Sequence, residues 1–352
     1  MVTGAGAALE RVTSEPVSER SPAISPDGRV LLFCVQTYDE LGENLEQSTL
    51  VGVEPNTRAQ RTLFTSTSSS SDRPAWIPDQ SSYVYSSNSP GAWSLVRALT
   101  AAPNAAINVI ASGEIAPGAS WPALSPDGRR VAFVTSVRGV PTVAIIGIDG
   151  SQLTLLGDGW SPAWSPDGTT LAFVRAVGSH LQLFLLNPRT GTDLVQLTAG
   201  DWDHYEPSFS PDAQYVVFST NRGWNRFPEG SPKRIKNLYI LKRDGTGLTQ
   251  LTDGNSLSAE PNWGADGWVY FSADQAGDFD IWRLRPEGEF ASLQRAQITA
   301  PLAAAGTLQP PAGAPTPAAS APAAPRSAGS GCSKDTDCKG ERICTNGHCV
   351  AP

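Results

Sequence analysis

The sequence predicts an all-β protein, a six-bladed β-propeller with four-stranded antiparallel blades, and three observations lead to that prediction. One short phrase occurs six times, as SPAISPDG, RPAWIPDQ, WPALSPDG, SPAWSPDG, EPSFSPDA and EPNWGADG. The prolines at the second position of these phrases (Pro22, Pro74, Pro122, Pro162, Pro207 and Pro261) lie 40 to 54 residues apart. Strand-like repeats of this length are typical of propeller blades, and no long segment has the 3.6-residue periodicity of a helix.

Each copy of the phrase is expected to form a strand, a tight turn and a second strand. The first strand alternates a small and a large residue, as in Ala23-Ile24 and Ala163-Trp164, which is the period-two pattern of a β-strand. The turn is Ser-Pro-Asp-Gly in three copies, where proline presets φ, aspartate binds local amides and glycine accepts a positive φ. The aspartate is present in all six copies, so we assign it to turn formation, because a catalytic residue is expected in one blade only.

The other strands of each blade follow at regular offsets. An aromatic residue lies six positions after the turn aspartate in five copies and five positions after it in the sixth; these residues are Phe33, Tyr85, Phe133, Phe173, Phe218 and Phe271. Third strands are expected at residues 49–53, 93–98, 142–148, 181–186, 237–242 and 280–284. Fourth strands are expected to end at residues 61–64, 108–111, 153–156, 195–198, 249–252 and 296–299. These elements extend the propeller from about Pro22 to Thr299.

We expect four segments along the chain. Residues 1–19 form an N-terminal segment, residues 20–299 the propeller, residues 300–331 a linker, and residues 332–352 a small disulfide-rich module. Residues 9–13 resemble the endings of the fourth strands, as do residues 296–299 in the last blade. One of these two segments is therefore expected to close the ring against the sixth blade.

Charge and composition limit the classes of partner. The net charge of −8 and pI of about 5.0 argue against nucleic acid or anionic lipid as the main partner. Basic residues gather at 232–237, which we expect to be a solvated loop. No apolar run is long enough to span a membrane, and residues 1–13 lack the pattern of an export signal. We expect a monomer.

The C-terminal tail differs in composition from the repeats. Alanine, proline, glycine and serine dominate residues 300–331, a composition that buries too little surface to fold. Four cysteines follow with C-x5-C-x5-C-x4-C spacing: Cys332, Cys338, Cys344 and Cys349. Zinc sites usually contain C-x2-C pairs, so the spacing favours two disulfides over a metal, with all three connectivities open. Disulfides imply an oxidising compartment, whereas Cys34 lies alone in a strand and is expected to be a buried, reduced thiol.

Two parts of the chain resemble known families. The segment LTDGNSLSAEPNWGADGWVYFSADQAGDFDIWRL and the phrase WSPDGTTLAFV resemble the WD-like repeats of TolB-type propellers, over residues 20–299. The resemblance implies a periplasmic or cell-surface protein that binds a partner protein at the mouth of its channel. TolB itself carries an α/β domain before the propeller, which we expect to be absent here. The tail is similar to small secreted modules with a Dickkopf-like cysteine pattern, through Asp335, Asp337, Cys338, Gly347 and Cys349.

The candidate binding site lies just before the repeat prolines. In a propeller, the loops that enter the innermost strands border one end of the central channel, so the two residues before each proline should converge there. Unlike the turn aspartate, these residues differ between blades, which suits recognition of a protein or peptide as well as it suits simple loop solvation. The predicted binding residues are Arg20, Arg73, Trp121, Trp160, Tyr205, Glu206 and Glu260.

We therefore expect a non-enzymatic interaction protein that needs no cofactor and no metal. The G-x-S-x-G elbow of a serine peptidase is absent from the sequence. The alternative is a metal-dependent hydrolase or lyase that acts on a glycan or lactone within the channel, a chemistry that needs several ligands around one ion. Asp201, Asp203, His204 and Glu206 are the residues that could contribute to such a site, but with a single candidate histidine we favour a polar loop beside the channel.

The cysteine spacing gives a first testable prediction. In protein made in an oxidising compartment, non-reducing peptide mass mapping should find Cys332, Cys338, Cys344 and Cys349 in two disulfides and Cys34 as a free thiol. A free thiol at Cys332 or Cys349 in such material would contradict the prediction.

Overall fold

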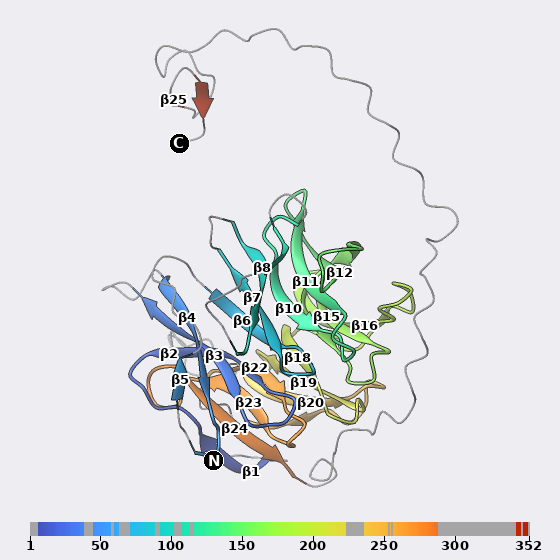
Figure 1. The fold of residues 1–352 in the computed structure, drawn as a ribbon. Helices are drawn as coiled ribbons and strands as arrows, with labels where there is room; N and C mark the ends of the chain where they lie inside the picture. Colours follow the sequence, from blue (N-terminus) through green and yellow to red (C-terminus); the bar gives the residue numbers. More distant parts are fainter. Residues whose placement is uncertain are drawn as a thin grey trace. The chain divides into compact units, whose positions relative to one another are not determined.

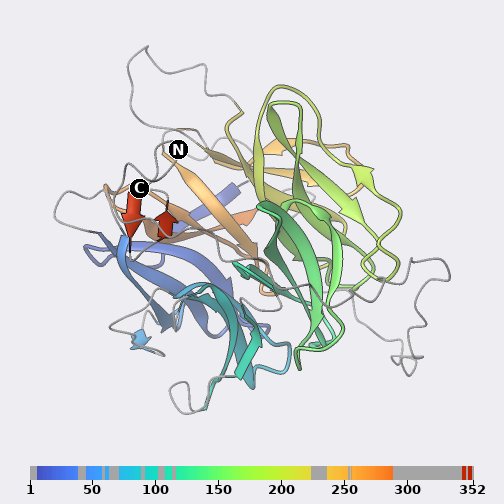
Figure 2. The same cartoon turned by 90° about the horizontal axis from the view of Figure 1, so that it is seen from above.

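The structure is a computed structural model that describes residues 6–38, 45–57, 60–62, 71–88, 92–101, 108–112, 116–222, 236–252, 254, 256–287, 343–345 and 348–350. The chain divides into two units, Met1–Thr299 and Ala300–Pro352. Within the first unit, the described residues form six four-stranded antiparallel sheets and no helix. The sheets follow one another in chain order around a common centre (Figures 1 and 2). The predicted six-bladed, all-β propeller is confirmed.

Each blade runs from an innermost strand to an outermost strand. The innermost strands are β2 (Ser18–Ile24), β6 (Ser71–Trp76), β10 (Ser120–Leu124), β14 (Trp160–Trp164), β18 (His204–Phe209) and β22 (Ser258–Trp263). The second strands are β3 (Leu31–Tyr38), β7 (Ser82–Ser87), β11 (Arg130–Val137), β15 (Leu171–Val177), β19 (Tyr215–Thr220) and β23 (Val269–Ala273).

The outer half of each blade contains its third and fourth strands. The third strands are β4 (Leu45–Val53), β8 (Ser94–Leu99), β12 (Val140–Gly147), β16 (His180–Leu186), β20 (Asn237–Lys242) and β24 (Asp280–Pro286). The outermost strands of blades one to five are β5 (Gln60–Thr62), β9 (Asn108–Ala111), β13 (Thr154–Asp158), β17 (Val195–Gln196) and β21 (Thr249–Gln250). The outermost strand of blade six is β1 (Gly6–Arg11).

The repeated Ser-Pro-Asp-Gly phrase forms the turn between the first and second strands. In the first blade, Asp27 Oδ1 accepts hydrogen bonds from Ser25 Oγ at 2.7 Å and from the Arg29 amide at 3.1 Å. Gly28 takes a φ of 73°, in the left-handed region where a side chain is unfavourable. The same serine–aspartate bond recurs at Asp127, Asp167 and Asp212, so the aspartate is a turn residue as expected.

The small and large residues of each innermost strand pack on opposite neighbours. Ala23 contributes to the core between blades one and two, whereas Ile24 contributes to the core between blades one and six. Trp76 lies against Ala23 and donates its indole N–H to the Ala23 carbonyl at 3.0 Å. The predicted aromatics of the second strands are at most 4% exposed, so they form the centre of these layers: Phe33, Tyr85, Phe133, Phe173, Phe218 and Phe271.

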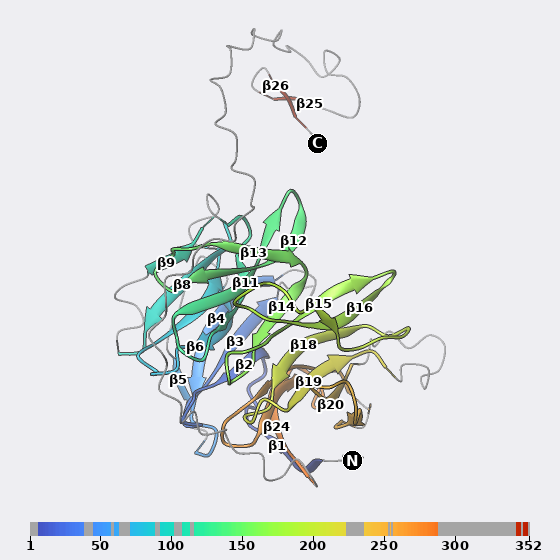
Figure 3. The same ribbon diagram turned by 90° about the vertical axis from the view of Figure 1, so that its right-hand side faces the viewer.

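The ring closes through the N-terminal strand. β1 pairs antiparallel with β24, so the first residues of the chain complete the blade formed by the last repeat (Figure 3). Glu10 lies opposite Arg283 and accepts its Nη2 at 2.7 Å, and Arg11 Nη2 donates to Asp280 Oδ1 at 2.8 Å. Of the two expected closing segments, residues 9–11 therefore lie in this position. Residues 296–299 lie outside the described part of the chain.

Two buried carboxylates lie at the seam between the first and last blades. Glu19 of β2 is 1% exposed and Asp280 of β24 is fully buried. Among the described residues, neither oxygen of Glu19 has a hydrogen-bond partner, whereas Asp280 is paired with Arg11. The Glu19 amide donates to the Phe279 carbonyl at 2.7 Å, which fixes the residue against blade six. Burial raises the pKa of Glu19 to about 7, and the negative charge of Asp280 adds to the effect.

The described residues of the second unit form two short strands that pair antiparallel. Its strands are β25 (Ile343–Thr345) and β26 (His348–Val350), with Cys344 opposite Cys349 in the backbone register. The predicted disulfides fall on side chains outside the described set and remain a prediction. Within the described residues of the propeller, Cys34 is a free, buried cysteine.

The seam predicts that ring stability depends on pH near neutrality. The folded-state pKa of Glu19, about 7, exceeds its ordinary value of 4.5, so folding favours the protonated form. The contribution of Glu19 to stability is then greatest below pH 4.5 and is lost as the pH rises to about 7. Glu19→Gln should remove this dependence and stabilise the propeller at pH 8 by up to about 3 kcal/mol, since one unit of pKa corresponds to about 1.4 kcal/mol.

Urea unfolding of both proteins at pH 5 and pH 8 measures this difference. Glu15→Gln is the matched comparison: Glu15 lies on the same segment but is exposed, and its charge is a smaller cause of the raised pKa of Glu19, so this variant should keep most of the pH dependence. Parallel pH profiles for wild type and Glu19→Gln would contradict the prediction.

Candidate functional site

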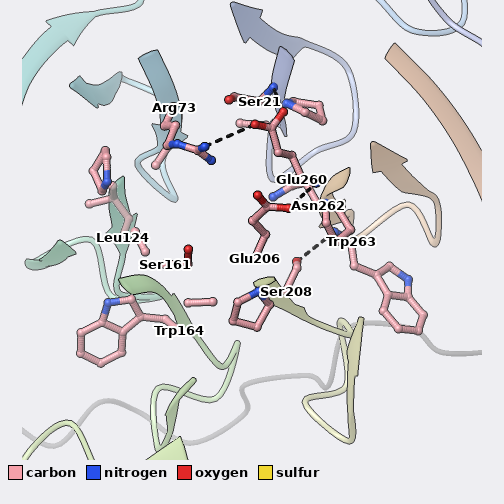
Figure 4. A pocket seen from close by; sticks show the side chains of 18 of the residues that line it. Ser21, Arg73, Leu124, Ser161, Trp164, Glu206, Ser208, Glu260, Asn262 and Trp263 are labelled. Atoms are coloured by element: carbon pink, nitrogen blue, oxygen red, sulfur yellow. Dashed lines mark hydrogen bonds and ion pairs between the residues drawn. The ribbon is translucent and has the colours of Figure 1, made fainter. Parts of the chain in front are cut away.

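The central channel contains a cavity of about 340 Å3 that all six innermost strands line. The residue directly before the repeat proline contributes in every blade: Ser21, Arg73, Trp121, Ser161, Glu206 and Glu260. Figure 4 shows Arg73, Glu206, Glu260 and Ser161 around this cavity. Six positions far apart in sequence therefore meet at one place, as the repeat pattern predicted.

A backbone irregularity presents these side chains to the channel. Each innermost strand shifts register at the residue before its proline, as between Arg20 and Ala23 in β2. The six residues have φ values from 49° to 56°, in the left-handed region that non-glycine residues rarely adopt. Such a conformation costs of order ~1–3 kcal/mol at each position, so the surrounding fold must impose it. Its recurrence in every blade makes the bulge a part of the propeller architecture.

The structure brings four of the seven predicted residues together in the channel. Arg73, Trp121, Glu206 and Glu260 line the cavity. Arg20, Trp160 and Tyr205 do not line it: Arg20 pairs with Glu260 from behind, and Trp160 packs against the core between blades four and five. The Tyr205 hydroxyl donates to Asp203.

Two channel residues were not among the seven predicted binding residues, although both belong to the positions that were expected to converge. Ser21 and Ser161 line the cavity at the same repeat position as the four that were predicted. Their place directly before Pro22 and Pro162 was the signal that could have found them.

Glu260 is the centre of the polar network. Its Oε2 accepts the Ser21 amide at 2.8 Å, Ser272 Oγ at 2.8 Å and Arg20 Nε at 3.1 Å. Its Oε1 accepts Arg73 Nη2 at 3.3 Å. Burial alone would raise the pKa of Glu260, but the charges of Arg20 and Arg73 outweigh it and hold the pKa well below its usual range. The carboxylate is therefore ionised and joins blade six to blades one and two.

The neighbouring acid and arginine extend this network. Glu206 Oε2 accepts the Glu260 amide at 2.9 Å, and Lys236 Nζ lies 3.6 Å from Glu206 Oε1. On the other side, the Arg73 guanidinium lies over the Trp121 ring, 3.2 Å from its centroid. Arg73 is thus held between a carboxylate and an aromatic face, which fixes it in one orientation.

The channel wall also includes the free edges of the innermost strands, which face the channel. The Ile24 amide donates to Asn262 Oδ1 at 3.0 Å, and the Trp263 amide donates to Ser208 Oγ at 3.0 Å. The residues equivalent to Ser208 and Asn262 in the other blades are alanines: Ala23, Ala75, Ala123 and Ala163. Side-chain caps for the edge amides are therefore confined to the sector where blades five, six and one meet.

The residues considered for a metal site do not converge in the structure. Asp203 and His204 do not line the channel cavity, unlike Glu206. His204 is 3% exposed and lies edge-on to Phe218, with ring centroids 5.2 Å apart. Burial lowers the pKa of His204 to about 4, and the nearby Arg222 charge adds to this effect. Asp203 accepts the Leu181 amide and an Asn221 amide proton. Among the described residues, no three histidine, cysteine or acidic side chains form a group that could hold a metal ion.

Comparison with known proteins agrees with the fold. Residues 109–226 match the family model described as the TolB beta propeller domain. Over 177 residues, the chain is 25% identical to a protein named Protein TolB homolog from Chlorobium luteolum, an alignment that covers 49% of this chain and 38% of the relative. The chain spans about a third of the length of the curated relatives it matches, 34% and 38%.

Solved structures show the same architecture. TolB from Acinetobacter baumannii superposes with a TM-score of 0.58 at 20% identity, over 72% of this chain and 58% of that protein. A gluconolactonase from Xanthomonas campestris superposes with a TM-score of 0.56 at 14% identity, over 79% of this chain and 89% of that protein. At these identities the likeness establishes the fold only. The chain thus has the fold of a six-bladed propeller, of which residues 109–226 match the TolB propeller model, and in its described part no helix is long and apolar enough to cross a membrane.

The central network predicts a large loss of stability when its acid is removed. Glu260→Ala would remove the carboxylate that pairs with both Arg20 and Arg73, and it would leave the Ser21 amide and the Ser272 hydroxyl without the acceptor they have in the wild type. Removal of one partner from a buried ion pair typically costs about 3–5 kcal/mol, and we expect that loss in urea unfolding. Glu260→Gln, which keeps an acceptor oxygen but no charge, should lose less. Wild-type stability in Glu260→Ala would show that the network is not structural.

Proposed function

We propose that the protein is a non-enzymatic binding protein that holds a protein or peptide partner at the mouth of its propeller channel. The observation that carries the proposal is the convergence of six blade-specific side chains on one cavity of about 340 Å3. Arg73, Trp121, Glu206 and Glu260 form the contact surface, together with Ser21 and Ser161. Arg20 supports this surface through Glu260, and Trp160 and Tyr205 flank it.

The rigidity of the site supports a binding role. Arg73 is held by Glu260 at 3.3 Å and by the face of Trp121, and Glu206 is held by Ser219 Oγ at 2.7 Å. Because these side chains are ordered before a partner arrives, little side-chain entropy is lost on binding. Tryptophan and arginine are also the residue types that most often dominate interface energies.

The charges of the site favour recognition by shape and local polarity. Arg20, Arg73 and Lys236 face Asp72, Glu206 and Glu260 within the network, so the opposite charges cancel. A partner that inserts a side chain or a chain end into the channel would replace water there. The charged side chains that it meets are already paired with one another. The match to TolB propellers supports a periplasmic or cell-surface location, and we propose that the partner is an envelope protein.

The test is comparative capture from bacterial envelope extract. The full chain, Trp121→Ala and Trp268→Ala are immobilised at equal amounts, and retained proteins are identified by mass spectrometry. Trp268 is the matched control, because it follows the turn at the opposite end of β22 and packs against Arg283 and Arg285. A partner retained by wild type and Trp268→Ala but lost on Trp121→Ala supports the proposal. Equal retention by all three proteins contradicts it, and one tightly held transition metal per chain would favour the lyase or lactonase alternative.

For the captured partner, affinity should depend on the aromatic side of the channel. Trp121→Ala removes the face on which Arg73 rests and should weaken binding by about 1–3 kcal/mol. The tryptophan is only half-buried, so the fold should remain intact, as circular dichroism and urea unfolding can check. Trp160→Ala should instead reduce stability, because Trp160 packs in the core between blades four and five. Calorimetric titration measures the affinity of wild type and of Trp121→Ala for the partner.

A further inference from the structure

One position on the second strand of each blade lies opposite the residue that begins the bulge. The strand registers place Cys34, Ser86, Val134, Val174, Ser219 and Ser272 at this position in blades one to six. Three blades therefore have a hydroxyl there, and three have a thiol or an apolar side chain. The residue before the repeat proline lies beside it on the innermost strand.

In blades five and six, the hydroxyl binds a glutamate of its own blade. Ser219 Oγ donates to Glu206 Oε2 at 2.7 Å, and the same oxygen accepts the Glu260 amide of the next blade at 2.9 Å. Ser272 Oγ donates to Glu260 Oε2 at 2.8 Å, and that oxygen accepts the Ser21 amide of blade one at 2.8 Å. One carboxylate oxygen thus joins a serine hydroxyl to the pre-proline amide of the following blade.

A carboxylate also lies at the junction of blades one and two. Asp72 Oδ1 accepts the pre-proline amide of Arg73 at 2.8 Å and Ser21 Oγ at 3.1 Å. Three successive junctions therefore bind the pre-proline amide to a carboxylate of the protein itself.

The junction of blades two and three has the two donors, the Ser86 hydroxyl and the Trp121 amide. At the position of Glu206 and Glu260, however, it has Arg73 instead of a carboxylate. Ser86 is 1% exposed, and its hydroxyl has no partner among the described residues. The pre-proline residue of blade two is Arg73, whose guanidinium points to Glu260 and Trp121. No described side chain accepts the amide of Trp121, the pre-proline residue of blade three.

A cavity occupies this junction. It has a volume of about 230 Å3 and is lined by Asp72, Arg73, Ser86, Trp93, Gly118, Ser120 and Trp121. This volume is below the range of about 300–1,000 Å3 that is usual for whole small-molecule ligands, so it suits a single side chain or chain end.

We propose that the cavity between blades two and three binds a carboxylate of the partner, which accepts hydrogen bonds from Ser86 Oγ and the Trp121 amide. This inference rests on the proposed function, and it names the chemical group that the partner inserts. Arg73 and Asp72 both border the cavity and pair with each other, with Arg73 Nε 3.5 Å from Asp72 Oδ2, so the two hydrogen-bond donors, not a net charge, select the carboxylate. The carboxylate of Asp72 is already bound by Ser21 Oγ and the Arg73 amide. Hydrogen bonds to a charged carboxylate are about twice as strong as those between neutral groups, which favours this occupant over a neutral one.

The remaining two junctions lack the hydroxyl. Val134 and Val174 occupy the serine position in blades three and four, so a carboxylate placed there would find one donor fewer and an apolar wall. The subsite is therefore specific to the junction of blades two and three.

Acetate is the probe, titrated into the full chain at constant ionic strength while the amide chemical shift of Trp121 is followed by NMR. A saturable shift with a millimolar dissociation constant is expected for so small a ligand. Acetamide, which has nearly the same shape without the charge, should give no saturable shift. No saturable shift with acetate overturns the proposal.

Ser86→Val tests the hydroxyl directly and copies the residue that blades three and four already have. It should weaken acetate binding about tenfold or more, because it removes a hydrogen bond to a charged group. Ser258→Ala changes another buried hydroxyl that has no partner among the described residues and lies outside both cavities, so it should leave the affinity unchanged. Equal acetate affinity in wild type and Ser86→Val overturns the proposal. Ser86→Ala serves the same purpose if the valine variant does not fold.

Two short peptides distinguish the source of the carboxylate. One carries a glutamate side chain and an amidated C-terminus, and the other has no acidic side chain and a free C-terminus. Whichever peptide shifts Trp121 and loses affinity in Ser86→Val identifies the group; loss for neither contradicts the proposal. A captured partner that depends on Trp121 but not on Ser86 would leave the proposed function intact and refute this subsite alone.

Discussion

The antiparallel pairing of β1 with β24 is the contact on which the closed ring depends. It joins the first residues of the chain to the last repeat, and it is strengthened by the ion pairs of Glu10 with Arg283 and Arg11 with Asp280. Because every blade packs on two neighbours only in a closed ring, this contact secures each of the interblade cores. It also fixes Ser21 beside Glu260, so the channel network forms only after closure.

The channel site follows from one repeated backbone feature. The left-handed bulge before each proline directs a side chain to the axis, and the proline then removes an amide from the exposed edge of the innermost strand. The architecture fixes the place of six side chains but leaves their chemistry free. Turn aspartates are therefore repeated, whereas the channel residues differ: arginine and tryptophan lie on one side, and paired glutamates lie on the other.

The pre-proline amides explain why the acids gather in one sector. An unpaired amide at a blade junction is costly, and Glu206, Glu260 and Asp72 each satisfy one. The same three carboxylates are neutralised by Arg20, Arg73 and Lys236, which makes the sector stable and electrically balanced. The opposite sector, with Trp121 and Ser161, has no such carboxylate pairing among the described side chains, and we propose that a partner contacts this half of the ring.

The number of blades, the turns and the aromatic layers could be predicted from the sequence, because each depends on short-range patterns that repeat. The channel residues Arg73, Trp121, Glu206 and Glu260 could also be located, since position within a repeat fixes position in a ring. Three other outcomes became visible only in the folded chain: Arg20 pairs with Glu260, Trp160 packs in a core, and Glu19 is buried at the seam. These outcomes depend on contacts between residues as far apart as Arg20 and Glu260, which local patterns do not specify.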